Sequence, residues 1–255
     1  MADQQLESTL GAVAAKISAS EGPLRALPAE TLTPLITSGK LVRADIGRVI
    51  IQPGKMPEAV FIVLDGRIRI LGSGPENSHP ELIQTLRTGG IAGMASLLAG
   101  APVEAATVSE NAVCLMIEAP HFLEFLDKNP DLRESLANQV SAPELYNLLA
   151  GDLARNALDI EKAGVIVRSQ LAEARLSNGS VSVDTDEDYL WWIASGASRG
   201  LRWSPDDGPV RRIGLPARLL ADIKITSTPP ATSTPQGLTF PTADAMFSGV
   251  NPPAI

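Results

Sequence analysis

The chain has 255 residues and a formal net charge of −8, which disfavours a polyanionic partner such as nucleic acid. One cysteine, Cys114, and two histidines exclude a disulfide framework and a protein-only transition-metal site of ordinary composition, and we expect neither a metal nor a cofactor. The N-terminus lacks a secretory signal pattern, and no apolar run approaches the roughly 20 residues that span a bilayer. We therefore expect a cytoplasmic protein that does not span a membrane.

In chain order, residues 3–38 are expected to be helical, with Pro28 in a first turn. Between 41 and 118 the pattern changes to short β-branched or apolar segments: LVRAD, GRVIIQ, AVFIVLDG, RIRILG, ELIQTLR, AATVSE and AVCLMIE. Short strands separated by Gly, Pro or acidic residues favour a small antiparallel sandwich or barrel. Within RIRIL, the isoleucines should share one face of the sheet and the arginines the other.

Helices are expected again from Pro120, in HFLEFLDKN, in PDLRESLANQV and in one long helix from Pro143 to about Leu176. The apolar stripe of that long helix would be Leu145, Leu148, Leu149, Leu153 and Ala157. The β pattern returns in VSVDT, DYLWWIASG, LRW and PVRRIGL, and Asp207-Gly208 in SPDDG predicts a hairpin turn. From Thr226 onward the composition is Pro, Thr, Ser and Ala, with too few apolar groups to build a core.

Residues 22–140 resemble the cyclic-nucleotide-binding domain, the jelly-roll module of the catabolite activator family and of cyclic-nucleotide-gated channels. GRVIIQPGKMPEAVFIVLDGRIRI has the spaced glycines of that module, GGIAG is similar to the approach to its phosphate-binding cassette, and APHFLEFLDKNPDLRESL is similar to its closing helix. The resemblance implies a mainly β fold with flanking α-helices.

With the resemblance in place, the chain divides into five expected parts. They are a helical lead-in over 1–40, a cyclic-nucleotide-binding-like jelly roll with closing helices over 41–140, a helical segment over 141–178, a small β element over 179–225 and a disordered Pro/Thr-rich linker or docking tail over 226–255.

The cassette of that family has Gly-Glu, a short helix, and then Arg followed by small residues. Its helix N-terminus and the Arg bind the cyclic phosphate, and the Glu accepts from the ribose hydroxyl. Here the corresponding positions are Gly93, Met94, Ala95, Ser96, Glu104, Ala105 and Ala106. Met94 stands where the Glu belongs and Glu104 where the Arg belongs, so both ligand-reading side chains are missing.

Replacing an Arg about 4 Å from a phosphate by a carboxylate reverses an interaction of roughly 4 kcal/mol at an effective dielectric constant near 20. The total change of up to about 8 kcal/mol equals the free energy of micromolar binding, so we expect the fold without its family ligand. Arg87, just before Gly89-Gly90, offers an alternative approach to a phosphate.

Other candidate sites have weaker support. GASRG at 196–200 matches G-x-S-x-G, but a strand and turn follow Ser198 and no histidine lies downstream, so we expect a tight turn and no enzyme activity. The acidic cluster at 184–188 lacks the Gly and distal Glu of a calcium loop and predicts a solvated turn. No basic recognition helix follows the module, which excludes a catabolite-activator type of transcription factor.

The layout of module, helical segment, LWWIASG and GLPARLL segments and Pro/Thr linker resembles the N-terminal cytoplasmic region of cyanobacterial type I secretion ABC exporters. That resemblance implies docking on the cytoplasmic side of a membrane-transport assembly.

We expect a non-catalytic regulatory or protein-interaction module; the alternative is a small-molecule receptor that binds a cyclic nucleotide or another ligand in the jelly-roll pocket. Trp191, Trp192 and Trp203 are either core or an exposed aromatic patch. Leu238, Phe240, Met246 and Phe247 are anchors on a protein partner, unless the tail is simply a solvated end.

Overall fold

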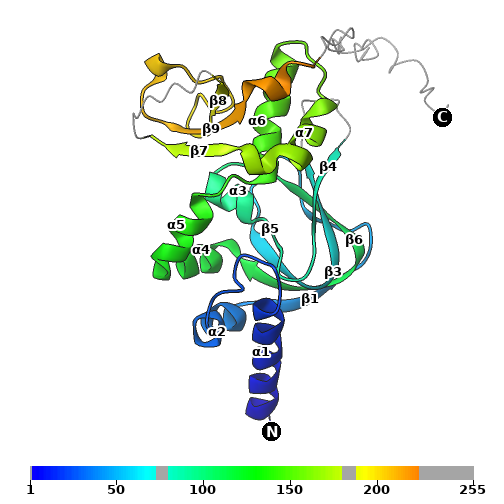
Figure 1. Cartoon of the computed structure of the whole chain (residues 1–255). Helices are drawn as coiled ribbons and strands as arrows, with labels where there is room; N and C mark the ends of the chain where they lie inside the picture. The colour runs from blue at the N-terminus through cyan, green and yellow to red at the C-terminus, as the bar shows by residue number, and fades with distance from the viewer. Residues whose placement is uncertain (1, 73–79, 180–187, 224–255) are drawn as a thin grey trace, which may run out of the picture. The chain divides into compact units, whose positions relative to one another are not determined.

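A computed structural model gives the fold and describes residues 2–72, 80–179 and 188–223 (Figure 1). The predicted tail over 226–255, with Leu238, Phe240, Met246 and Phe247, lies outside the described residues. So do the predicted strand VSVDT and the acidic cluster except Asp188.

The N-terminal region is two helices and not one, because α1 (Ala2–Ser18) ends before a turn and α2 (Ala29–Ser38) begins after Pro28. The Ser20 hydroxyl donates to the Ile17 carbonyl at 2.7 Å and accepts from the Gly22 N–H at 3.1 Å, which closes the end of α1. A Cβ on Gly22 would lie 2.0 Å from the Gly89 carbonyl oxygen. The turn therefore lies directly against the loop that precedes β5.

The jelly roll is one antiparallel sheet with strand order β1-β6-β3-β4, in which β2 also pairs with β6 and β5 with β3. Its strands are β1 (Lys40–Ala44), β2 (Val49–Ile51), β3 (Ala59–Gly72), β4 (Glu81–Leu86), β5 (Ile91–Ala92) and β6 (Ala105–Glu118). The predicted fold class, a mainly β jelly roll with flanking helices, is confirmed.

The strand lengths were predicted wrongly, because AVFIVLDG and RIRILG form the single strand β3, and AATVSE and AVCLMIE form β6. The register between β3 and β6 shifts around Asp65 and Arg67, where a break between two strands was predicted. Both strands continue through this irregularity. Gly66 permits this: its φ is +79°, and a Cβ there would lie 2.2 Å from the Asn111 carbonyl oxygen on β6.

Both faces of β3 are buried near its start. Ile62 and Leu64 belong to the cluster that packs under α1, α2 and α4, whereas Val63 belongs to the cluster inside the roll. Burial on two faces explains the continuous apolar run FIVL. Further along, the isoleucines of RIRIL are at most 1% exposed and its arginines are exposed, as predicted. Cys114 is a core residue, also as predicted.

Five helices follow from within the sheet onward: α3 (Met94–Ala99), α4 (Ala119–Lys128), α5 (Pro130–Ala137), α6 (Ala142–Arg155) and α7 (Lys162–Gln170). The long helix predicted from Pro143 to Leu176 is wrong. The helix that forms there, α6, ends just before Ala157. Ala157 takes a φ of +53° and the Leu158 N–H bonds to the Leu153 carbonyl at 2.8 Å, an arrangement that terminates helices. Ala157 lies outside α6, and Leu176 lies in a strand.

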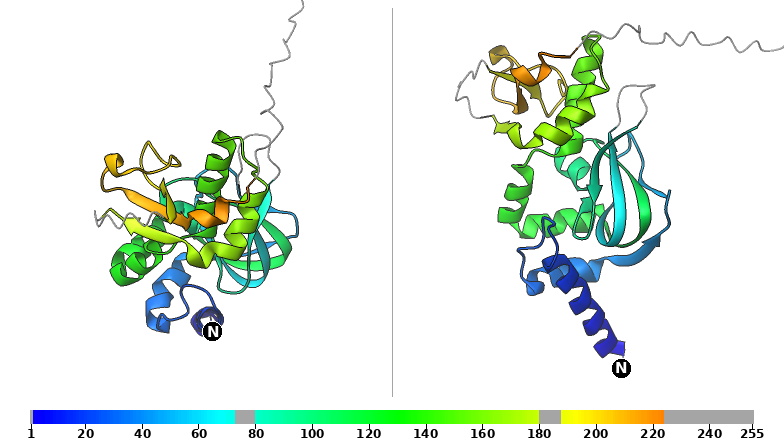
Figure 2. Two further views of the ribbon diagram at one scale, coloured as in Figure 1. Left: turned by 45° about the horizontal axis from the view of Figure 1, so that its top comes forward. Right: turned by 45° about the vertical axis from the view of Figure 1, so that its right-hand side comes forward.

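The small β element is a sheet of order β7-β9-β8, formed by β7 (Arg175–Asn178), β8 (Tyr189–Ile193) and β9 (Arg211–Pro216), with short 3₁₀ helices η1 (Leu171–Glu173), η2 (Pro205–Asp207) and η3 (Ala217–Leu220). Its buried face packs on α6 and α7 in one apolar cluster, and the two views of Figure 2 show these strands beside the helices.

The hairpin predicted at Asp207-Gly208 is not formed. Arg202 pairs with Trp192 at one edge of β8, and β9 pairs with the other edge of β8. The segment LRW and β9 are therefore not adjacent strands, and η2 lies in the connection that crosses from one edge of β8 to the other. Across the described ranges, no helix is long and apolar enough to cross a membrane.

Candidate functional site

The segment aligned with the family's cassette includes the N-terminus of α3, whose free backbone N–H groups, from Gly93 to Ser96, can bind an anion; we call these groups the cradle. β5 leads to Gly93, whose φ of +94° turns the chain into α3, and Met94 is the first residue of that helix. The predicted short helix at Ser96 is therefore present. Ala105 and Ala106 open β6 and are 6% and 0% exposed, so the small residues after the cassette are core positions.

Glu104 fills this cradle with its own carboxylate. The residue is 2% exposed, and its Oε1 accepts the Ser96 backbone N–H at 3.2 Å. Ser96 is itself fully buried, and its Oγ accepts the Val103 N–H at 3.1 Å. In the segment that sequence analysis aligned with the phosphate-binding cassette, the N-terminus of α3 thus bonds to the carboxylate of Glu104, the residue directly before β6.

Burial raises the pKa of Glu104 from 4.5 to about 7. The backbone N–H groups of Ser96, Gly93 and Ala95 and the Ser96 hydroxyl oppose that rise, because they bond to the charged form. Burial outweighs these donors, of which the Ser96 backbone N–H bonds to Oε1 at 3.2 Å. The carboxyl group therefore changes between the acid and the anion near neutral pH.

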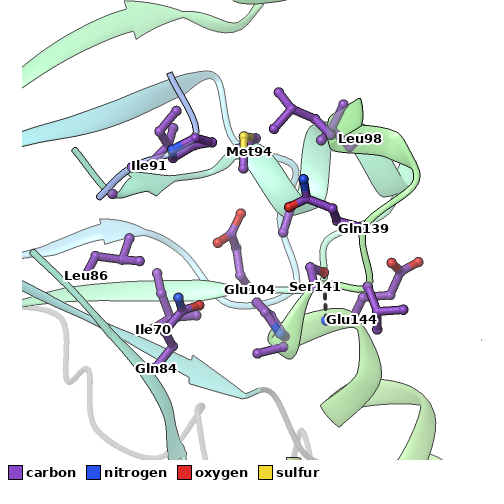
Figure 3. Close-up of a pocket in the computed structure, with 18 of the residues that line it drawn as sticks. Ile70, Gln84, Leu86, Ile91, Met94, Leu98, Glu104, Gln139, Ser141 and Glu144 are labelled. Carbon is purple, nitrogen blue, oxygen red and sulfur yellow. Dashed lines mark hydrogen bonds between the residues drawn. The ribbon is translucent and has the colours of Figure 1, made fainter. Parts of the chain in front are cut away.

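A cavity of about 880 Å³ opens beside the cradle, within the range of small-molecule sites (Figure 3). One wall is apolar and comes from β3 to α3; it consists of Ile70, Leu86, Ile91, Met94 and Leu98. The turn after α1, the α5–α6 connection and single residues of the small sheet complete the lining. Figure 3 shows the Glu104 carboxyl group pointing toward the segment of Met94, with Gln84 and Gln139 on either side of it.

Arg87 and Arg211 are cations at the lining of this cavity. Arg211 binds Glu144 through two contacts, Nη1 to Oε1 at 2.5 Å and Nη2 to Oε2 at 3.0 Å. Arg87 is exposed at the cavity and makes no ion pair within the described residues. Glu144 is 2% exposed, so its charge is held by its arginine partners and not by water.

Sequence analysis missed the structural role of Arg199 in the segment GASRG. Ser198 lies in an exposed turn, with no helix after it, as predicted. Its neighbour Arg199 donates from Nη2 to Glu144 Oε1 at 3.1 Å and from Nη1 to the Ala99 carbonyl at 3.3 Å and the Ala194 carbonyl at 2.7 Å. Arg199 thereby joins the end of α3, α6 and the small sheet. Ala99 and Glu144 lie 100 and 55 residues from Arg199 in the sequence, and no local pattern could have identified these two contacts.

The tryptophans divide between the two predicted alternatives. Trp192 is 0% exposed, so the hypothesis that it belongs to an exposed patch is wrong. Trp191 and Trp203 are half-buried, and the Arg212 guanidinium lies 5.3 Å and 4.0 Å from their rings. Their aromatic faces are thus partly used inside the small sheet, in cation–π contacts.

No group of three or more His, Cys, Asp or Glu side chains that could hold a metal occurs among the residues with described positions. His121 is exposed in the first turn of α4.

The comparisons with known proteins support the fold and the module. Residues 41–129 match the family model of the cyclic nucleotide-binding domain. This part of the chain therefore has a cyclic-nucleotide-binding-like fold. The match lies within the residues 22–140 for which the sequence resemblance was found.

Two curated relatives are the cGMP-dependent protein kinase 2 of Homo sapiens and that of Mus musculus. Each is 27% identical over 120 residues, which are 46% of this chain and 16% of the kinase. This chain therefore spans about a sixth of the length of the curated relatives that it matches.

Similar solved structures include the regulatory domain of Toxoplasma gondii PKA with cAMP (TM-score 0.44, 13% identity, 82% of this chain and 86% of that one). Others are the sensor domain of the transcriptional regulator DNR from Pseudomonas aeruginosa (0.42, 20%, 53% and 87%) and the Thermus thermophilus catabolite activator protein (0.42, 16%, 59% and 83%).

Proposed function

We propose that this protein is a non-catalytic regulatory module that keeps the cyclic-nucleotide-binding fold and has lost cyclic-nucleotide binding. The observation that carries the proposal is the Glu104 carboxylate at the start of α3. A cyclic phosphate entering the cradle would have to displace this group from its buried hydrogen bonds. When Glu104 is ionised, the phosphate would also meet a like charge.

The two barriers to an anion, the charge of Glu104 and the volume that its side chain occupies, act over different pH ranges. Above a pH of about 7 the charge of Glu104 opposes an anion, and below it the neutral acid still occupies the same volume. Met94 removes the acceptor that the family uses for the ribose hydroxyl. Lowering the pH should therefore not restore cyclic-nucleotide binding.

Calorimetric titration with cAMP and cGMP tests this proposal. The native protein should give no binding heat, and Met94→Glu with Glu104→Arg should gain binding. Glu104→Gln is the matched control, because it removes the charge without adding a cation; it should stay silent. Tight binding by the native protein would overturn the proposal. A silent but folded double variant, checked by circular dichroism, would show that Glu104 and Met94 are not what prevents binding.

The interaction half of the proposal concerns a protein partner. We propose docking on the cytoplasmic side of a larger membrane-transport assembly, through the half-buried rings of Trp191 and Trp203 and through the segment 226–255. Support comes from the resemblance in layout to exporter N-terminal regions. Membrane co-sedimentation of the full chain from cells of its source, compared with a chain lacking 226–255, tests it; equal recovery in the soluble fraction for both would argue against it.

A second candidate function is a small-molecule receptor. It is favoured by one observation, the cavity of about 880 Å³ that remains beside the filled cradle.

A further inference from the structure

The buried charged groups of the cavity beside Glu104 already have hydrogen-bond partners within the protein. Glu104 accepts the Ser96 N–H at 3.2 Å, and Glu144 and Arg211 bind each other at 2.5 Å and 3.0 Å. Arg87 and Glu21, also at the lining, are exposed. A charge on a ligand placed beside the buried Glu144–Arg211 pair and away from these exposed groups would lose its water without gaining an unpaired counter-ion, which costs free energy.

The uncharged polar groups of the cavity are, in contrast, available. The side-chain amides of Gln84 and Gln139 make no hydrogen bond within the described ranges 2–72, 80–179 and 188–223. Each amide offers donors and an acceptor. Gln84 comes from β4 and Gln139 from the α5–α6 connection, and Figure 3 shows Gln84 near Ile70 and Leu86 and Gln139 near Leu98, at two parts of the apolar wall.

We propose that this cavity is a receptor site for an uncharged, mainly apolar ring molecule that carries an amide-like or hydroxyl group at one edge. The ring lies on the apolar wall formed by β3 to α3, and the polar edge bonds to Gln84 and Gln139. The proposal rests on the second candidate function, that of a receptor. It differs from the family's ligand in charge, since Glu104 takes the place of the ligand's phosphate.

A series of probes with one ring system and three charges tests the proposal at neutral pH. The probes are naphthalene-1-acetamide, naphthalene-1-acetate and naphthalen-1-ylmethylamine, with binding followed by ligand-observed NMR and calorimetry. The neutral amide should bind at least about tenfold more tightly than either charged probe, a difference of about 1.4 kcal/mol. Absence of binding by the amide at millimolar concentration overturns the proposal, as does tighter binding of the cation.

A matched pair of variants locates the site. Gln139→Trp places a large ring in the cavity from an exposed position, and Ser135→Trp places the same ring on an exposed position of α5 that does not line the cavity. Binding of the amide should be lost in Gln139→Trp and kept in Ser135→Trp. Equal binding by both variants would mean that the probe binds elsewhere and that the cavity is not the receptor site.

The experiment also separates this inference from the loss of cyclic-nucleotide binding. If the acetate binds best and Arg87→Gln abolishes that binding, the cavity accepts anions through Arg87 and the inference is wrong. If no probe binds and cAMP is also silent, only the receptor inference fails. If cAMP binds tightly, the proposed function itself fails.

Discussion

Glu104 should make the stability of this protein depend on pH in an unusual direction. Its carboxyl group has a pKa of about 7 in the fold, raised from 4.5 chiefly by burial. Folding therefore favours the protonated form. The stabilisation is fully present below a pH of about 4.5, is lost as the pH rises toward 7 and is absent above that value.

The magnitude follows from the two pKa values, which differ by about 2.5. At about 1.4 kcal/mol for each pKa unit, the full effect is about 3 kcal/mol, and most of it falls between the two pKa values, from 4.5 to about 7. The residue is only 2% exposed, so screening by solvent reduces this value little.

The assay is urea unfolding of the native protein and of Glu104→Gln at several pH values. Glutamine stays neutral throughout, so other titrating groups cancel in the difference between the two proteins. The native protein should lose about 2 to 3 kcal/mol relative to the variant between pH 5 and pH 8. Parallel stability curves would refute the reasoning, because they would mean that the Glu104 pKa is the same in the folded and unfolded chains.

Three further predictions concern single positions. Burial raises the pKa of the Cys114 thiol to about 11, so labelling of this single thiol by a disulfide reagent should require unfolding and follow its rate; fast labelling of the native protein would contradict this. Arg202→Ala removes the main partner of Asp152, whose side chain is 3% exposed, and should lower the free energy of unfolding in urea by about 3 kcal/mol. The control Arg133→Ala breaks an exposed ion pair and should lower it by under about 1 kcal/mol. Gly66→Ala should cost at least about 2 kcal/mol, because it combines a φ of +79° with a Cβ clash at 2.2 Å, and an unchanged melting temperature would exclude that strain.

Much of the fold could be predicted from the sequence because its signals are local. The alternation in RIRIL, the short helix after Gly93 and the apolar run AVCLMI each depend on neighbouring residues. The errors lie where tertiary contacts decide. The register irregularity near Gly66 joins two predicted strands, and the backbone turn at Ala157 ends a helix that propensity alone would extend.

For the candidate site, the sequence predicts only which residues differ from those of the family's cassette, and not how their side chains are placed. Sequence analysis aligned Glu104 with the Arg of the family's cassette, which predicts repulsion of a phosphate. It cannot tell whether that carboxylate turns to solvent or occupies the cradle, since the answer depends on the packing around Ser96 and Val103. The contacts of Arg199 with Glu144 and Ala99 span 55 and 100 residues, beyond any periodic pattern.

The pairing of β3 with β6 sets the order in which this protein can fold during translation. Ala59 pairs with Glu118 and Ile62 with Leu115, whereas the far end of β3 pairs with the nearer β4, as in Ile68 with Leu86. The β3–β4 hairpin can form early, and β5 can then pair with Phe61 and Ile62, but the other edge of the FIVL half stays unpaired until β6 leaves the ribosome. At about 5–20 residues per second, the separation between Ile62 and its partner Leu115 leaves that edge unpaired for on the order of 3 to 11 seconds.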